Sequence, residues 1–211
     1  MDTSAEIEPP SKLRIVVIAA EFDPSLTYLE NILCRALSRL GHHVTVISNL
    51  PQRPQKKTLL DIDKELPFEI HRCRNVFRIF NSFFAIGDGS AKKLASLSPD
   101  VAFLLAPLNG LGFTLLPHIP ATCKVISAFS DLPCHRKNRS LSTFVKSRWA
   151  PAIFQRSSLV MAATKATGEL LESWVDEEEA KKISVTGLLL DLSQEPSPSD
   201  LPSGVGRLLE A

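Results

Sequence analysis

The sequence predicts an α/β domain with a doubly wound, mostly parallel sheet of about seven strands and helices on both faces. Short runs of β-branched and apolar residues recur along the chain. Each run is followed by a helical pattern or a long connection. The first runs are almost wholly apolar, which is typical of parallel strands covered on both sides.

The first unit along the chain has the pattern strand, helix, strand. Residues 13–20 predict a strand because nearly all are apolar. The next segment predicts a helix with one apolar stripe. That stripe consists of Leu29, Ile32, Leu33, Ala36, Leu37 and Leu40. Residues 27–30 resemble a capping box at the start of this helix, and Gly41 indicates its end. Residues 43–48 predict the second strand.

The later elements continue the alternation. Residues 51–64 are polar and contain prolines, so they predict a surface loop. Residues 76–97 predict two helical halves interrupted at 87–89. Further strands are predicted at 68–73, 100–105, 124–128, 159–163 and 183–186, and further helices at 111–116, 141–155 and 167–174. Residues 1–192 are expected to form this domain, and 193–211 have the composition of a linker.

Composition excludes several classes of protein. The 211 residues carry a net charge of +1, so we expect no nucleic-acid partner. No apolar stretch approaches the roughly 18 residues of a membrane span, and the amino terminus does not resemble a signal peptide. We therefore expect a cytoplasmic protein. The four cysteines include no C-x-x-C pair, so we expect no disulfide framework. His71/Cys73 and Cys134/His135 could assemble a zinc site from two distant segments, but we expect no metal, with the cysteines as small core residues and the histidines at the surface.

Ligands of open parallel sheets bind at the carboxyl ends of the strands, so the loops there are the candidate site. These loops contain no G-x-G-x-x-G, P-loop, G-x-S-x-G or H-E-x-x-H motif. What remains is the start of the first helix near 25–27, whose backbone N–H groups could face an anion. The same residues could instead do no more than cap the helix.

Several short motifs in the same order resemble those of family 4 glycosyltransferases. Residues 12–49 are similar to the opening of that family, with an F-x-P sequence after the first strand and an R-x-G-H-x-V pattern before the second. The other matching segments are 99–101, 131–133, 158–164 and 183–191. The resemblance extends over about 180 residues.

This resemblance implies a fold and an activity. The chain would be the Rossmann-like, acceptor-side half of a GT-B glycosyltransferase, which moves a sugar from a nucleotide-sugar donor to a glycan or lipid-linked acceptor. The donor-binding half is not in this sequence, so the chain would be inactive without a donor-binding domain or subunit. The nucleotide sugar is a substrate, and no cofactor is implied. Two alternatives are a non-catalytic docking subunit and a plain nucleotide-binding module, the latter opposed by the missing glycine fingerprint.

The resemblance also assigns candidate roles to individual residues. Asp131 would be catalytic, facing the acceptor. The donor-phosphate loop would comprise Pro24, Ser25 and Thr27, where the family has a pair of glycines. The acceptor-side loops would contribute Asn109, Gly110, Thr164 and Lys165.

Basic and aromatic residues in the second half of the chain suggest a further partner. Arg136, Lys137, Arg139 and Trp149 suit an anionic membrane surface or a lipid-linked acceptor, as do the aromatic residues of 77–84. The protein would then lie peripherally on the cytosolic face of a membrane. Alternatively, the aromatic residues face the sheet and the cations form a solvated rim.

Overall fold

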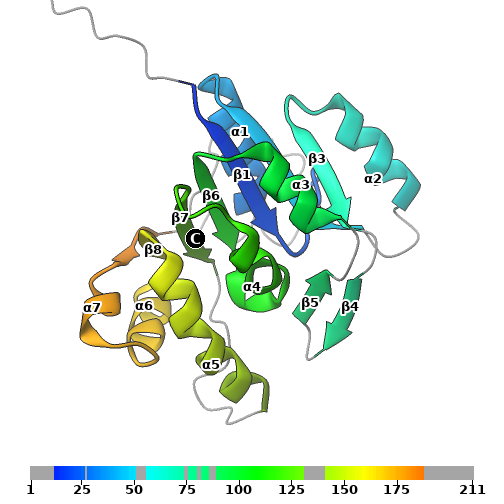
Figure 1. The fold of residues 1–211 in the computed structure, drawn as a ribbon. Coiled ribbons are helices and arrows are strands. Elements are labelled where there is room, and N and C mark those ends of the chain that lie inside the picture. Colours follow the sequence, from blue (N-terminus) through cyan, green and yellow to red (C-terminus); the bar gives the residue numbers. More distant parts are fainter. Residues whose placement is uncertain are drawn as a thin grey trace, which may run out of the picture.

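The computed structural model describes residues 12–26, 28–50, 56–73, 76–79, 82–85, 89–130 and 141–187. Its centre is a seven-stranded sheet in which every pair is parallel, with the order β3-β2-β1-β6-β7-β8-β9 (Figure 1). These strands are β1 (Arg14–Ala19), β2 (His43–Asn49), β3 (Glu69–Cys73), β6 (Val101–Leu105), β7 (Lys124–Phe129), β8 (Leu159–Ala162) and β9 (Ile183–Val185). The predicted fold class is confirmed, and the chain carries a Rossmann-like α/β domain.

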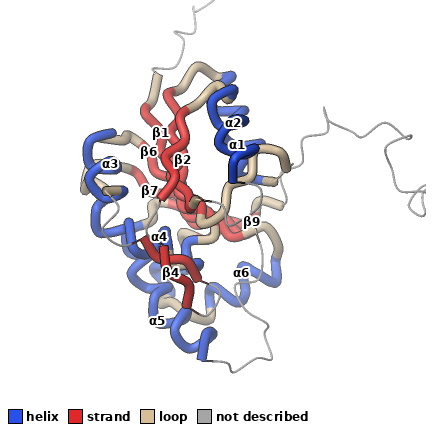
Figure 2. The backbone as a smooth tube through the Cα atoms, turned by 90° about the vertical axis from the view of Figure 1, so that its right-hand side faces the viewer, coloured by secondary structure: helices blue, strands red, loops and turns tan. Residues whose placement is uncertain are grey.

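Helices lie on both sides of this sheet. Figure 2 shows α1 and α2 on one side of the strands and α3 on the other. The helices are α1 (Leu29–Arg39), α2 (Lys56–Ile62), α3 (Ser90–Leu97), α4 (Leu111–Leu115), α5 (Leu141–Arg156), α6 (Lys165–Glu172) and α7 (Glu177–Ala180). The described chain also contains short 3-10 turns, labelled η1 (Asp63–Glu65), η2 (Pro107–Asn109) and η3 (Leu116–His118).

The pleat of the strands divides the core into two layers. Alternate residues of β1, β6, β7 and β8 pack under α3, α4, α5 and α6, where Leu104, Val125 and Phe154 are completely buried. The intervening residues face α1 and contact its Cys34 and Leu33. Burial raises the pKa of the Cys34 thiol to about 12, so this cysteine is a small apolar core residue rather than a nucleophile.

The helix predicted in the first half of 76–97 is wrong. Strands β4 (Val76–Ile79) and β5 (Ser82–Ala85) form an antiparallel pair outside the main sheet, with Ile79 opposite Ser82. Two residues separate the strands, which is the connection length of a tight hairpin. The segment is rich in aromatic and β-branched residues, which favour strands over helices. The second half is helical as predicted, from Ser90 to Leu97.

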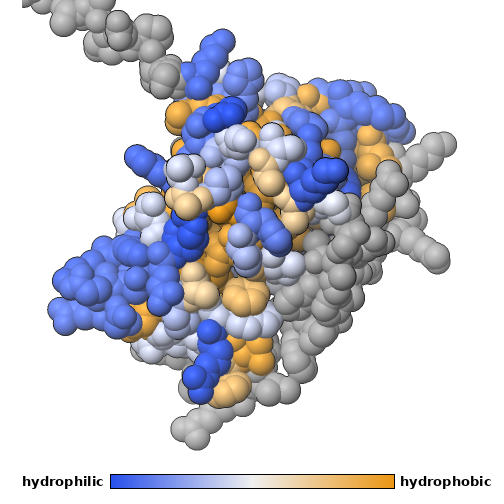
Figure 3. All heavy atoms as spheres, in the orientation of Figure 1, coloured by the Kyte–Doolittle hydropathy of each residue, from blue (hydrophilic) through white to orange (hydrophobic). Residues whose placement is uncertain are grey.

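Three smaller expectations also need correction. The segment predicted as a loop contains α2 and η1 within its described part. The first helix has Tyr28 rather than Thr27 at its N-cap, with no side-chain cap. The short helix α7 was not predicted, and its acidic first turn is capped by Asp176, which accepts from the N–H of Glu179 at 2.9 Å. The surface over α7 is hydrophilic (Figure 3).

In the described part of the chain, no helix has the length and hydrophobicity required to cross a membrane.

Candidate functional site

The strand order reverses between β1 and β6, and this reversal locates the candidate site. The helix after β1 covers one side of the sheet and the helix after β6 covers the other. The loops that leave these two neighbouring strands therefore diverge at their carboxyl ends. In open α/β sheets this switch point is where ligands bind. The described parts of the two loops are residues 20–26 and 106–110.

The first loop is held in shape by Asn31, in the first turn of α1. Its buried amide Nδ2 donates to the carbonyl oxygens of Pro24 at 2.9 Å and Leu26 at 3.0 Å. Arg35 in turn donates from Nε to Asn31 Oδ1 at 2.9 Å. One side chain thus fixes both ends of the turn that follows Pro24. Asn31 lies outside the apolar stripe of this helix and belongs to no motif, so the sequence did not indicate its role.

Ser25, expected near the donor phosphates, is exposed but already has a partner. Its backbone N–H and its hydroxyl both donate to Asp23 Oδ1, at 2.9 Å and 2.5 Å. A carboxylate therefore occupies the donors that an anion would need. Phosphate binding at this point requires Asp23 to release Ser25, or a cation from outside the loop. The other expected residues are Pro24, which is buried, and Thr27, which lies outside the described residues.

A buried ion pair anchors the other side of this loop. Arg72, at the end of β3, makes a two-pronged contact with Asp63, at 2.8 Å from Nη2 and 2.9 Å from Nε. Its Nη1 donates to the carbonyl oxygens of Phe22 at 2.7 Å and Asn49 at 3.3 Å. The guanidinium also lies 5.8 Å from the ring centre of Phe22. Arg72 therefore ties three segments together, and its cation is already neutralised within the fold.

Two polar side chains at the end of β2 are buried and have no hydrogen-bond partner among the residues that the structure describes. They are the hydroxyl of Ser48 and both amide atoms of Asn49. Unpaired polar groups of this kind are uncommon, because each loses its hydrogen bonds to water on folding. Both residues adjoin the segment that Arg72 ties to the first loop. The Ser48 hydroxyl and the Asn49 amide together offer three donor hydrogens as well as acceptor oxygens at this edge of the sheet, and no sequence motif indicated them.

The second loop is tightly built from backbone contacts. Ala106 has a φ of 47°, and Gly110 has a φ of 95° that favours glycine. The Gly110 carbonyl accepts from both the backbone N–H and the hydroxyl of Thr114, at 2.8 Å and 2.9 Å. Asn109 lies in η2, so its backbone is at this edge, while its side chain is outside the description. The expected acceptor-side residues Asn109 and Gly110 thus lie at the switch point.

The remaining expected acceptor-side residues, Thr164 and Lys165, follow β8, which lies two strands from β6 in the sheet. Thr164 follows β8 and caps α6, accepting from the N–H of Thr167 at 3.1 Å. Lys165 is strongly exposed, with Nζ 4.0 Å from Glu169 Oε1. Thr164 therefore has a structural role, and Lys165 supplies a positive charge near the carboxyl ends of the strands. Ser130, just past the end of β7, directly precedes Asp131 in the chain, but Asp131 itself lies outside the described residues.

The surface expected to meet a membrane is only partly described. Arg136, Lys137 and Arg139 lie outside the described residues. Trp149 is half-buried on α5 and stacks on Phe113, with ring centres 4.8 Å apart, so it belongs to the core. The exposed aromatic residue of this helix is Phe144, which has the Arg148 guanidinium 5.4 Å from its ring centre.

A separate cluster of potentially reactive side chains is buried beneath α3. Ser90 Oγ lies 3.3 Å from His71 Nε2 and 3.0 Å from Cys73 Sγ. A serine beside a histidine can act as a nucleophile only where substrate reaches it. Ser90 is 1% exposed and Cys73 is completely buried. Ser90, Cys73 and the half-buried His71 therefore join β3 to α3.

The comparisons with known proteins leave the family open. No family model matches the chain, and a search of curated proteins finds no match. The fold and the geometry of the switch point therefore define the class of protein as a Rossmann-like α/β domain.

Proposed function

We propose that this chain is the acceptor-side half of a glycosyltransferase. It would bind a glycan or lipid-linked acceptor and complete its active site with a donor-binding domain or subunit that carries the nucleotide sugar. The proposal is supported by the parallel sheet with reversed order at β1 and β6, and by motifs along the chain that resemble family 4 glycosyltransferases, of which F-x-P follows β1 at the reversal. The alternative remains a docking subunit that pairs with a separate catalytic chain.

The observation that carries this proposal is the polar construction of the carboxyl edge beside β1 and β2. Asn31 fixes the first loop, and beside it the polar groups of Asn49 and Ser48 are buried with no partner among the described residues, so an acceptor would reach them only when this edge of the sheet opens. A neutral polyol such as a sugar offers both donors and acceptors, which suits a carboxamide and a hydroxyl. A diphosphate is bound by cations or by free backbone N–H groups. Residues 21–26 contain no cation, and the Ser25 N–H already donates to Asp23.

The distribution of charge suggests how the reaction would be divided between two halves. In glycosyl transfer an acceptor hydroxyl attacks the anomeric carbon of the donor, and a nucleoside diphosphate leaves. Stabilisation of the charge on the leaving group is usually the largest catalytic contribution. In this chain Asp23 places a carboxylate where the diphosphate would need positive charge. The cations would therefore come from the other half, while Asp131 and the loops at Asn109–Gly110 and Thr164–Lys165 would face the acceptor.

Calorimetry and a transfer assay test the proposal together. Purified chain is titrated with UDP- and GDP-linked hexoses and with oligosaccharide acceptors, and turnover is then measured with and without a donor-binding domain. We expect acceptor binding that Asn49→Leu weakens and Glu177→Gln, on the exposed α7, leaves unchanged. We expect turnover only after the donor-binding domain is added. Robust transfer by the chain alone would contradict the proposal. Binding of a catalytic chain without any sugar binding would favour the docking subunit.

A further inference from the structure

Two exposed apolar side chains lie at the switch point, where the first loop enters α1. Tyr28 is 59% exposed and Leu26 is 41% exposed. The same loop contains the exposed Ser25 and the half-buried Asp23. A single exposed apolar residue on a protein surface needs no explanation. An aromatic ring, an aliphatic side chain and a carboxylate close together in the chain, at the edge of the sheet where ligands bind, are the usual components of a small-molecule site.

Tyr28 occupies the N-cap position of α1, although its side chain does not cap the helix. Its backbone is extended, with φ −90° and ψ 160°, and its carbonyl accepts from the N–H groups of Asn31 and Ile32 at 3.0 Å and 3.1 Å. Serine, threonine, aspartate and asparagine are preferred at this position, because their side chains accept hydrogen bonds from the first turn. Within the described part of the chain, the Tyr28 ring has no aromatic partner and its hydroxyl no hydrogen bond. Helix capping therefore does not explain a tyrosine here, and such departures from local preference are expected at functional sites.

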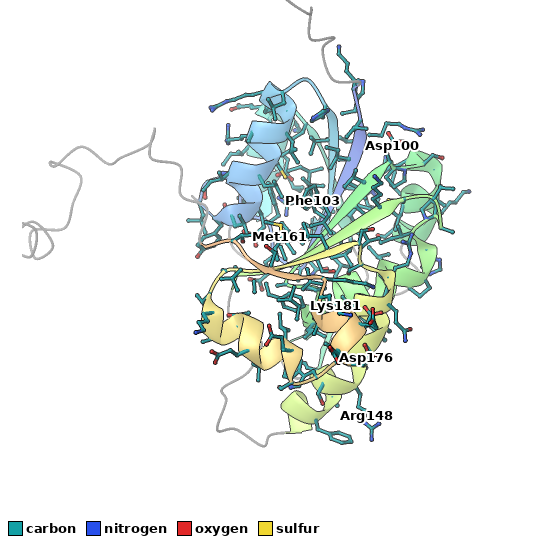
Figure 4. The ribbon with its side chains drawn as sticks, turned by 90° about the vertical axis from the view of Figure 1, so that its left-hand side faces the viewer. Asp100, Phe103, Arg148, Met161, Asp176 and Lys181 are labelled. Carbon is teal, nitrogen blue, oxygen red and sulfur yellow. The ribbon has the colours of Figure 1, made fainter. Side chains whose placement is uncertain are left out.

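The helix end that carries this ring is firmly held. On the inner side of α1, Cys34 belongs to the buried cluster against which Phe103 and Met161 of the sheet pack, and both of these side chains lie beside α1 in Figure 4. Before the helix, Asn31 holds the loop through two of its carbonyl oxygens. The backbone of Tyr28 is thus fixed before any ligand arrives, which lowers the entropy lost on binding.

We propose that Tyr28 is an acceptor-binding residue whose ring stacks on one face of a pyranose. The axial C–H groups of a pyranose make one face of its ring apolar, while its hydroxyl groups lie around the edge. Tyr28 and Leu26 match the apolar face. Asp23 matches the hydroxyl groups, because hydrogen bonds within the described residues use its Oδ1 and leave Oδ2 to accept. The same carboxylate disfavours an anionic ligand. This inference rests on the proposed function and identifies its acceptor as a pyranoside.

Tyr28 is the only tyrosine in the sequence, so a tyrosine label reports on this residue alone. Protein labelled with 3-fluorotyrosine gives one ¹⁹F NMR signal. We expect this signal to shift when cellobiose, lactose, maltose and mannobiose are tested as acceptors, and to stay in place with sorbitol, which has hydroxyl groups but no ring. A shift with UDP and with none of the disaccharides would overturn the inference, because the tyrosine ring would then stack on the donor's base.

Calorimetry with the same disaccharides separates the two levels of the argument. Heat of binding without a ¹⁹F shift would overturn the role of Tyr28 and leave the proposed function standing. Neither heat nor a shift with any disaccharide would overturn the proposed function, and this inference with it.

Three variants distinguish a binding role for Tyr28 from a structural one. Tyr28→Ser removes the ring and supplies a preferred N-cap residue, so disaccharide affinity should fall about 3- to 10-fold while the urea midpoint stays unchanged or rises. Tyr28→Phe keeps the ring and should bind within about twofold of the wild type. Leu40→Ala, at the opposite end of α1, removes an apolar side chain that is even more exposed and should leave binding unchanged. Equal affinity of the wild type and Tyr28→Ser would overturn the inference. A lower urea midpoint in Tyr28→Ser would also overturn it, because the tyrosine would then be structural.

Discussion

At the residue scale, the shape of the first loop depends on buried polar groups that serve more than one segment. Asn31 reaches from a helix to two loop carbonyls, and Arg72 reaches from a strand to a third. Each of these carbonyls would otherwise lose a hydrogen bond to water on folding. The loop therefore has a defined shape without any glycine between residues 20 and 26.

Replacement of Asn31 should destabilise the fold and loosen this loop. Asn31→Ala removes both donations and leaves two carbonyls with poorer partners, so the free energy of unfolding should fall by about 1–3 kcal/mol. Asn31→Asp keeps an acceptor for Arg35 but loses both donors, and should be similarly destabilising. Urea unfolding measures both variants, with Arg39→Ala at the exposed end of α1 as the control. An unchanged urea midpoint in both Asn31 variants would show that the loop holds its shape without this amide.

A second residue-scale prediction concerns Asp100, at the start of β6. Hydrogen bonds from the Arg14 guanidinium and from the Arg14 backbone N–H hold the pKa of this carboxyl below its ordinary value. A depressed pKa in the folded state stabilises the fold above the ordinary pKa of about 3.9, and this contribution is lost as the pH falls through the folded pKa. Arg14→Gln should raise the pKa of Asp100 only part of the way, because the backbone N–H bond remains. A carboxyl titration followed by NMR measures the shift, and no upward movement would contradict it.

At the scale of elements, the sequence predicted what depends on local pattern and missed what depends on packing. The buried strands and α1 were predictable because their apolar residues repeat with the period of the element. Residues 76–85 were misassigned because a short apolar run fits either period, and in the structure they form two antiparallel strands with Phe77 opposite Phe84. The location of the candidate site at the carboxyl ends of the strands was predictable, because a parallel sheet gathers these ends at one edge. The roles of Asn31, Asn49 and Arg72 were not, since each depends on contacts between distant segments.

The junction of η2 and α4 yields a prediction at this scale. A Cβ atom at Gly112 would lie 3.0 Å from Pro107 Cα and 3.3 Å from its carbonyl oxygen, both backbone atoms with little freedom to move. Gly112→Ala should therefore cost about 1–3 kcal/mol in thermal or urea unfolding, because the loop at the switch point must shift. Gly168→Ala on α6 is the matched control. There the nearest atom belongs to the exposed side chain of Val185, and alanine favours the helix by up to about 1 kcal/mol. Equal effects of the two changes would contradict this explanation.

At the scale of the whole molecule, charge is balanced overall but unevenly distributed along the sequence. The net charge of +1 provides no long-range attraction to an anionic surface. Residues 136–148 nevertheless contain five cations, which are Arg136, Lys137, Arg139, Lys146 and Arg148. On α5, Arg148 lies beside the exposed ring of Phe144, a combination suited to a lipid headgroup region. Any membrane contact would therefore be local and confined to this part of the chain.

We accordingly predict weak, salt-sensitive binding to anionic membranes. Each cation near such a surface contributes on the order of 1 kcal/mol, and the attraction is screened within about 10 Å at 0.1 M salt. Co-sedimentation with vesicles containing phosphatidylserine should exceed that with neutral phosphatidylcholine vesicles and should fall as salt is raised. Arg136→Glu/Lys137→Glu/Arg139→Glu should abolish the difference, and Phe144→Ser should reduce it. The control is Lys92→Glu/Lys124→Glu/Lys181→Glu, which reverses three exposed lysines outside 136–148 and should retain most of the binding. Equal and negligible sedimentation under every condition would mean that these cations form a solvated rim, and that the acceptor reaches this domain from solution.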